Sequence, residues 1–383
     1  MNSSKSSKDK SQSIGNILRV GFVGIVVTAI CVWMVLPPLE TFRFSKYDVS
    51  SQQELVMELT SIPDVGPRPM VAFSADGSTA AYLSKMTGTP PEVEFQSQVV
   101  VIEIDSAKQV AGPFPVANTT KPLDIAFSRD GTHLAVAAAD EVRVWGLGDS
   151  TLAAAILLPN VRLQSQRFVA ISHDGKRIAT SLQSDDGISA ICVFDSSSGE
   201  KIQTLERTAG TANDQRFAFH PTANQVIGPA DSDGGDAHLC VWDAESGKIV
   251  NEIIDSEDCR TLALAFNDAG DSMAVAMYLA SREYIPFATA VFKTDSWQQK
   301  ISIDNEDYVF WVALNRDANQ ICLVDASGTA SIWSTGEGNR LQNFKLGPPS
   351  ATAFSSDGGT LRLVTNSKDN PDAANLVTLR PSE

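Results

Sequence analysis

The sequence returns seven times to a pattern that is clearest in Ile125-Ala126-Phe127-Ser128-Arg129-Asp130-Gly131. Two close copies occupy residues 71–77 and 169–175, and looser copies begin at residues 217, 264, 312 and 352. The copies are spaced by 40 to 54 residues, and alanine is always the second residue. Self-similarity at such a period is typical of a repeat architecture, so the sequence predicts seven structural units after residue 50.

Each unit is predicted to contain four antiparallel strands. The repeated pattern alternates apolar residues with a period of two and, in its clearest copies, ends in the Asp-Gly of a hairpin turn. A second strand follows, such as residues 133–137, and a third ends in an aromatic residue, as in Val241-Trp242-Asp243. After a polar turn a fourth strand closes the unit, such as residues 248–253. The sequence therefore predicts an all-β, seven-bladed β-propeller, whose blades need small alanines where they converge on the axis.

Two stretches resemble the WD40 family. Trp242-Asp243 is the family's signature dipeptide, and residues 325–333 match its turn and third strand. The resemblance covers residues 52–383 in degenerate form, since no Gly-His dipeptide occurs and most third strands end without Asp. It implies a rigid hub on which protein partners dock at the face of the central channel. The Phe-Ser-x-Asp-Gly turns are equally similar to TolB-like and lactonase-like bacterial propellers.

The last unit supplies only three strands, the third of which ends at residues 376–379. Residues 52–60 precede the first unit and have the pattern of the fourth strands elsewhere. We expect residues 52–60 to pair with residues 374–380, because a ring that borrows its missing strand from the N-terminal side leaves no open edge in that blade.

The N-terminal segment predicts a membrane anchor. Residues 1–16 are rich in Ser and Lys and predict a disordered tail, whereas residues 17–36 are almost entirely apolar. Twenty helical residues span about 30 Å, which matches the hydrocarbon core, and no small-residue cleavage site follows. Residues 17–36 are therefore expected to form a transmembrane helix, followed by a linker over residues 37–51. Lys and Arg exceed Asp and Glu only before the helix, so the tail is expected in the cytoplasm and the propeller outside it, periplasmic in a bacterium.

Composition excludes several classes of function. A net charge of −16 disfavours non-specific nucleic-acid binding. The chain has four histidines and five scattered cysteines, and it lacks nucleophile-elbow, phosphate-loop and zinc-helix motifs. Residues 231–242 fail as a calcium loop because the twelfth position is a tryptophan. His173 and His220 are interpreted as surface turn residues. We expect no cofactor and no bound metal.

One group of residues forms a candidate site. Five cations precede the innermost strands of five units, and aromatic residues occupy the same segment of the sixth: Arg68, Lys121, Arg167, Arg216, Arg260, Tyr308, Phe310 and Trp311. In a propeller these connections gather at one mouth of the central channel. The sequence therefore predicts a cationic and aromatic rim, suited to an acidic or phosphorylated peptide or to a small anion. Alternatively, these cations pair with nearby acidic residues such as Asp124 and only stabilise loops.

The leading functional prediction is a membrane-anchored, non-catalytic protein-interaction platform. A lactonase-like hydrolase is the alternative, but it would need several inward-facing carboxylates at one rim, where this chain offers mainly basic and apolar residues. A sensor of a small ligand is a third possibility, although a tail of 16 residues is too short for an output domain. An insertion at residues 278–287 of the fifth unit is expected near the same mouth as the rim.

Overall fold

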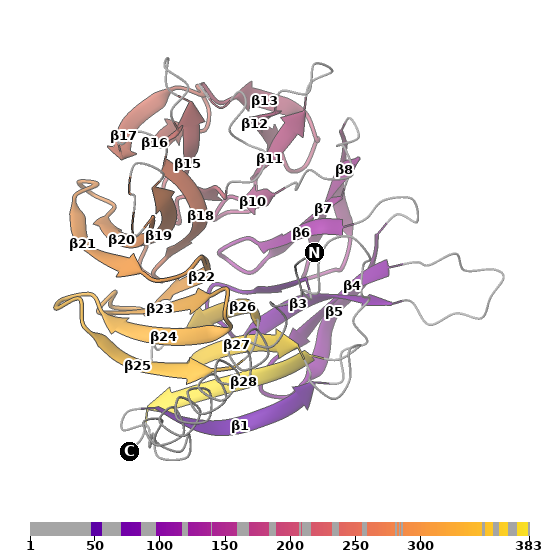
Figure 1. Cartoon of the computed structure of the whole chain (residues 1–383). Helices are drawn as coiled ribbons and strands as arrows, with labels where there is room; N and C mark the ends of the chain where they lie inside the picture. The colour runs from indigo at the N-terminus through magenta and orange to yellow at the C-terminus, as the bar shows by residue number, and fades with distance from the viewer. Residues whose placement is uncertain are drawn as a thin grey trace, which may run out of the picture. The chain divides into compact units, whose positions relative to one another are not determined.

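The computed structural model describes the backbone of residues 47–55 and residues 70–381 apart from several connections, namely residues 86–96, 117–121, 139, 159–167, 184–188, 207, 209–215, 232–236, 255–258, 280–281, 283, 285, 347–348, 355–359 and 367–373. The strands of this part of the chain form seven four-stranded antiparallel sheets (Figure 1). This arrangement confirms the predicted all-β, seven-bladed propeller. The predicted tail and transmembrane helix, residues 1–36, lie outside the described residues. Within the described part of the chain, no helix is long and apolar enough to cross a membrane.

In six blades the four strands follow one another in the chain, from the channel outward. Blade one contains β2 (Val71–Phe73), β3 (Thr79–Lys85), β4 (Ser97–Glu103) and β5 (Lys108–Val116). Blade two contains β6 (Pro122–Phe127), β7 (His133–Ala138), β8 (Glu141–Gly146) and β9 (Leu152–Leu157). Blade three contains β10 (Val169–Ile171), β11 (Arg177–Gln183), β12 (Ser189–Asp195) and β13 (Lys201–Thr204). Blade four contains β14 (Ala218–Phe219), β15 (Gln225–Asp231), β16 (Ala237–Asp243) and β17 (Ile249–Ile254). Blade five contains β18 (Cys259–Phe266), β19 (Ser272–Leu279), β20 (Phe287–Lys293) and β21 (Gln299–Asn305). Blade six contains β22 (Val309–Leu314), β23 (Gln320–Asp325), β24 (Thr329–Ser334) and β25 (Arg340–Lys345).

The seventh blade combines strands from both ends of the propeller. Its inner three strands are β26 (Pro349–Phe354), β27 (Leu361–Asn366) and β28 (Ala374–Pro381), and its outermost strand is β1 (Tyr47–Leu55). Figure 1 shows indigo β1 alongside yellow β28. The closing strand lies at residues 47–55 rather than at the predicted residues 52–60, and it begins inside the predicted linker. The register sets this position, because Tyr47 lies opposite Pro381 and Leu55 lies opposite Ala374, the first residue of β28.

Neighbouring blades are held together by apolar clusters at their seven interfaces. Trp242 of the signature dipeptide is fully buried in the cluster between blades three and four. Its Nε1 donates a hydrogen bond of 2.9 Å to the backbone carbonyl of Glu206, which follows the last strand of blade three. The signature tryptophan is thus a core residue that joins two blades.

In blades one, two, three, five and six, the side chain of the fourth residue of the repeated pattern closes the turn after the innermost strand. The side chain of Ser128 is fully buried, accepts a hydrogen bond of 2.9 Å from the backbone N–H of His133 and donates one of 2.6 Å to Asp130. Ser172 has the same arrangement in blade three. Asn315 accepts from the backbone N–H of Gln320 at 3.0 Å in the same way. These buried acceptors satisfy backbone donors that the turn would otherwise leave without a partner.

Candidate functional site

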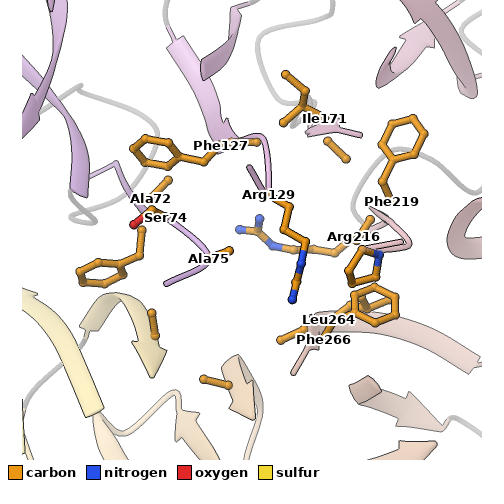
Figure 2. Close-up of a pocket in the computed structure, with 18 of the residues that line it drawn as sticks. Ala72, Ser74, Ala75, Phe127, Arg129, Ile171, Arg216, Phe219, Leu264 and Phe266 are labelled. Carbon is orange, nitrogen blue, oxygen red and sulfur yellow. The ribbon is translucent and has the colours of Figure 1, made fainter. Parts of the chain in front are cut away.

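The innermost strands surround a central channel of about 370 Å³. The alanines of the repeated pattern line it from all seven blades: Ala72, Ala126, Ala170, Ala218, Ala265, Ala313 and Ala353. Larger side chains enter this space from the two ends of the innermost strands, and Figure 2 shows those of Arg129 and Arg216 projecting into it. We call the end at which the chain enters the innermost strands the loop-side mouth, and the end at which these strands turn back the turn-side mouth.

The structure describes five of the eight predicted rim residues. These five all lie at the loop-side ends of their innermost strands: Arg216, Arg260, Tyr308, Phe310 and Trp311. Arg68, Lys121 and Arg167 lie outside the described residues. The described five are divided between two features of this mouth, a fixed arginine in the channel and an aromatic surface over blades five and six.

Arg216 is fixed by three other blades. Its guanidinium carbon lies 4.6 Å from the ring centroid of Phe168 in blade three and 4.9 Å from that of Trp311 in blade six. Its Nη1 lies 3.7 Å from Oδ1 of Asp124 in blade two. A guanidinium held between two ring faces and a carboxylate has lost most of its conformational freedom, so Arg216 is a rigid cation across the loop-side mouth.

Asp124 supplies the counter-charge. Its Oδ2 accepts a hydrogen bond of 3.0 Å from the backbone N–H of Val169, and its side chain is 16% exposed. Burial raises the pKa of Asp124, while the charge of Arg216 and the Val169 N–H act in the opposite direction. Arg216 therefore pairs with Asp124, as the alternative interpretation of the rim cations predicted. The pair nevertheless leaves the guanidinium 30% exposed at the channel.

Four aromatic rings form what we call the aromatic ridge, made of Tyr278, Phe287, Tyr308 and Phe310. The ring centroids of Tyr278 and Phe287 are 5.6 Å apart, those of Phe287 and Tyr308 5.9 Å, and those of Tyr308 and Phe310 4.5 Å. All four side chains are half-buried. The ridge therefore presents a connected aromatic surface across blades five and six at the loop-side mouth.

A cation and a projecting ring flank the ridge. Arg260 of β18 is exposed and lies directly opposite Tyr278 in the β18–β19 ladder, so the two side chains are on the same face of the sheet. Tyr284, between β19 and β20, is 87% exposed. The sequence predicted an insertion over residues 278–287 near this mouth, but it did not predict that the rings of Tyr278 and Phe287 pair and join the rim. The signal was cross-strand pairing, since these two residues are direct partners at the ends of β19 and β20.

The turn-side mouth carries a second set of polar residues, which lie just beyond the ends of the innermost strands: Arg129, His173, His220, Asp268 and Arg316. Nη2 of Arg129 in blade two lies 3.2 Å from Oδ1 of Asp268 in blade five. His220 is only 7% exposed, so its interpretation as a surface turn residue is wrong. It occupies the fourth, turn-closing position of its unit, where Ser128 and Asn315 are also buried, whereas His173 occupies the fifth position of its own unit.

The described residues contain no group of three or more His, Cys, Asp and Glu side chains that could hold a metal ion. Four cysteines, Cys192, Cys240, Cys259 and Cys322, are buried. Burial raises the pKa of the Cys192 thiol, and it raises that of Cys322 to about 12. Thiols with raised pKa values stay protonated near neutral pH and are poor nucleophiles, so these two side chains act as small apolar core residues.

Comparison with known proteins gives matches in structure but not in sequence. No family model matches the chain, and the search of curated proteins found no match. A chain in the crystal structure of the mitotic checkpoint complex aligns with a TM-score of 0.63 and 14% identity, covering 91% of this chain and 95% of that one. A chain of the Kuenenia stuttgartiensis hydrazine synthase aligns with a TM-score of 0.57 and 17% identity, covering 84% and 97%. At these identities the likeness establishes that the chain is a β-propeller.

Proposed function

We propose that the protein is a non-catalytic interaction platform whose loop-side mouth binds an acidic segment of a protein partner, and that residues 17–36 anchor it in a cell membrane with the propeller outside the cytoplasm. The observation that carries the docking proposal is the aromatic ridge with Arg260 beside it. The similarity to a propeller from the mitotic checkpoint complex agrees with this type of function but does not decide it, because propellers also occur in enzyme complexes.

The ridge has the properties of an interface centre. Tyrosine, tryptophan and arginine dominate the energetics of protein interfaces, where they contribute large rigid areas at low entropic cost. The rings of Tyr308 and Phe310 already contact each other, with centroids 4.5 Å apart, so little ordering is needed when a partner docks. Half-burial leaves each ring with surface to cover, and the cross-strand pairing of Tyr278 with Phe287 holds these two rings in place.

The charges of the chain favour a partner that has an acidic segment. The chain carries a net charge of −16, so most of its surface repels acidic proteins. At the loop-side mouth two cations are available to such a segment, since Arg260 is exposed beside the ridge and the side chain of Arg216 remains 30% exposed in the channel. An extended segment with one apolar and one or two acidic side chains would match the ridge and Arg260 together.

A hydrolase would need a different lining. In the described part of the channel wall the loop-side mouth has one carboxylate, Asp124, and both of its oxygens are already engaged by Arg216 and by the Val169 N–H. A cation-dependent site of the lactonase-like kind requires several carboxylates directed at one point. This favours the platform.

The docking proposal is tested by cross-linking the tagged full-length protein in cells and identifying the partners by mass spectrometry. The test variants are Arg260→Glu and Phe310→Ser. The control variants are Lys248→Glu and Leu157→Ser, which make the same kinds of change, a charge reversal and a loss of an apolar side chain, at exposed positions next to β17 and in β9. We expect a discrete partner that is lost in both test variants and kept in both controls. An unchanged set of partners in the test variants, or its loss in the controls as well, would remove the ridge as the docking site.

The anchor is tested separately by fractionation and protease protection. The full chain should stay in the membrane after alkaline carbonate washing, and deletion of residues 17–36 should release it. Protease added outside intact cells, or outside the inner membrane in a double-membrane bacterium, should cleave the propeller and leave the tail. A wild-type chain released by carbonate would contradict the anchor, and a protected propeller would contradict the orientation.

A further inference from the structure

We propose that the turn-side mouth of the channel binds a small oxyanion, a phosphate or carboxylate group, between Arg129, Arg316 and the imidazole of His220. This site lies at the opposite end of the channel from the ridge and is independent of the proposed docking function. Nothing at the loop-side mouth is needed for it.

The lining of this mouth consists mainly of hydrogen-bond donors. These four residues come from blades two, three, four and six, and each lies one or two residues beyond the end of its innermost strand: Arg129, His173, His220 and Arg316. Asp268 is the one carboxylate of the described lining at this mouth, and it lies against Arg129. The described lining of this mouth thus holds two arginines and a single aspartate, which is a local positive excess within a strongly acidic protein. An anion drawn into the channel would relieve this excess.

His220 presents a donor whose tautomer is fixed by the turn. Its Nδ1 accepts hydrogen bonds from the backbone N–H groups of Thr222, at 3.2 Å, and Ala223, at 3.1 Å. A nitrogen that accepts twice carries no proton, so the neutral ring bears its proton on Nε2. The ring is held edge-to-face by Phe266, with centroids 5.4 Å apart. His220, which belongs to the channel lining, therefore carries its donor on Nε2 in a ring that its neighbours hold in place.

The electrostatics of His220 respond to an anion. Burial lowers the pKa of His220, and the positive charges of Arg129 and His173 lower it further. An oxyanion between these groups would offset the repulsion and raise the pKa again. The imidazole of His220 is thus a built-in reporter for occupancy of the site.

Arg129 keeps donor capacity after its ion pair is formed. Its contact with Asp268 uses Nη2, while a guanidinium has five N–H donors in a rigid fork. Its side chain is 24% exposed and enters the channel (Figure 2). The channel volume of about 370 Å³ is near the lower end of ligand pockets, roughly 300–1,000 Å³. The ligand is accordingly small, such as inorganic phosphate or a short dicarboxylate.

The test is a titration of the full-length protein with inorganic phosphate, followed by NMR of ring-labelled histidines at constant ionic strength. The chain has only four histidines, so each can be assigned. We expect saturable shifts of the His173 and His220 signals and a raised pKa of His220, with His133 and His238 as internal references. A parallel titration with succinate distinguishes a phosphate ligand from a carboxylate ligand. The anion that binds with the higher affinity identifies the chemical group that the site prefers. The proposal is overturned if neither anion gives a saturable shift.

Variants locate the binding. Arg316 is exposed, so Arg316→Gln leaves the fold intact and should weaken binding about tenfold, as expected for one lost charge-assisted hydrogen bond. Arg129→Gln should weaken it at least as much. The matched control is Arg177→Gln, which breaks another ion pair between blades, at 3.5 Å to Glu245, away from the channel lining. Equal affinity in Arg316→Gln and wild type, or an equal loss in Arg177→Gln, would refute the site.

Discussion

Arg362 of the seventh blade forms an ion pair of 2.8 Å with Asp105 of the first blade, across 257 residues of sequence. Arg362 is 6% exposed as a residue and also donates to the backbone carbonyl of Gly77 in the first turn of blade one. The arginine therefore fastens two elements of the first blade to the blade that contains both ends of the propeller. This contact joins the two blades between which the ring closes.

We expect Arg362→Gln to lower the free energy of unfolding by about 2 kcal/mol, because a buried charged donor and its acceptors lose their partners. Urea unfolding of the full-length chain measures the effect. Arg177→Gln, which removes an ion pair to the mostly exposed Glu245, should change stability by less than about 1 kcal/mol. If the two variants were equally stable, Arg362 would have no special role in closing the ring.

Removal of β1 should leave a propeller that aggregates or is readily cleaved, since the edge of β28 would lose the strand that pairs with all eight of its residues. Limited proteolysis and light scattering of a chain lacking residues 47–55 test this. A deletion of residues 37–45 shortens the same region but keeps the strand, and it should behave like wild type. A stable, soluble chain without residues 47–55 would show that blade seven does not need its fourth strand.

The turn-closing serines should contribute measurably to stability. Ser128→Ala removes the acceptor for the His133 N–H and the donor to Asp130 from a fully buried site, so we expect a loss of about 1–2 kcal/mol. Ser197→Ala removes a similar hydrogen bond of 2.6 Å to Asp195 at an exposed turn and should cost less than about 0.5 kcal/mol. Thermal and urea unfolding compare the two. Equal losses would mean that burial of the serine is unimportant.

Stability should fall in acid because turn aspartates have lowered pKa values. Hydrogen bonds from Ser197 and Ser198 lower the pKa of Asp195 from 3.8 to about 2, and the Ser246 backbone and hydroxyl lower that of Asp243. At Asp130 burial acts to raise the pKa, but hydrogen bonds from Ser128 and Thr132 outweigh it. Groups with lowered pKa values stabilise the fold above their unfolded pKa, and this contribution disappears as pH falls through the folded value.

The free energy of unfolding should therefore decrease between about pH 4 and about pH 2. The raised pKa of Asp124 contributes a change of opposite sign to the free energy of unfolding. A single such group makes the dependence of stability on pH less steep but does not reverse it. Urea unfolding across this range measures the slope, and Asp195→Asn should make it shallower. A stability that stays constant down to the lower limit would contradict the assignment of these turns as acid-sensitive.

The blade number and strand order could be predicted because the repeated pattern records them directly. The alanine in the second position marks the axis in all seven units, and the channel lining shows the same seven residues. The exact bounds of the closing strand were less accessible, since β1 is defined by its register with β28 and not by a boundary signal of its own.

The candidate site was predicted only in part, because many of its contacts join residues that are far apart in the sequence. Arg216 was found from its place before an innermost strand, but its partners Phe168, Trp311 and Asp124 come from three other blades, and no local pattern indicates which cation will meet which ring. The aromatic ridge could not be predicted without the register between β19 and β20, which pairs Tyr278 with Phe287. The burial of His220 follows from its place in the repeated pattern, where other units have a buried serine. Contacts around an axis depend on the closed ring and are not encoded within one repeat.

The pairing of β1 with β28 also sets an order of events during biosynthesis. More than three hundred residues separate Leu55 from Ala374, so at roughly 5–20 residues per second a ribosome needs on the order of tens of seconds between completing the two strands. During that interval β1 is finished while its partner does not yet exist. Blades one to six can form as they emerge, but the ring closes only when the last strand is made. The N-terminal strand must therefore be kept from pairing elsewhere until synthesis ends, and a chain truncated near its C-terminus would expose two unpaired edges at once.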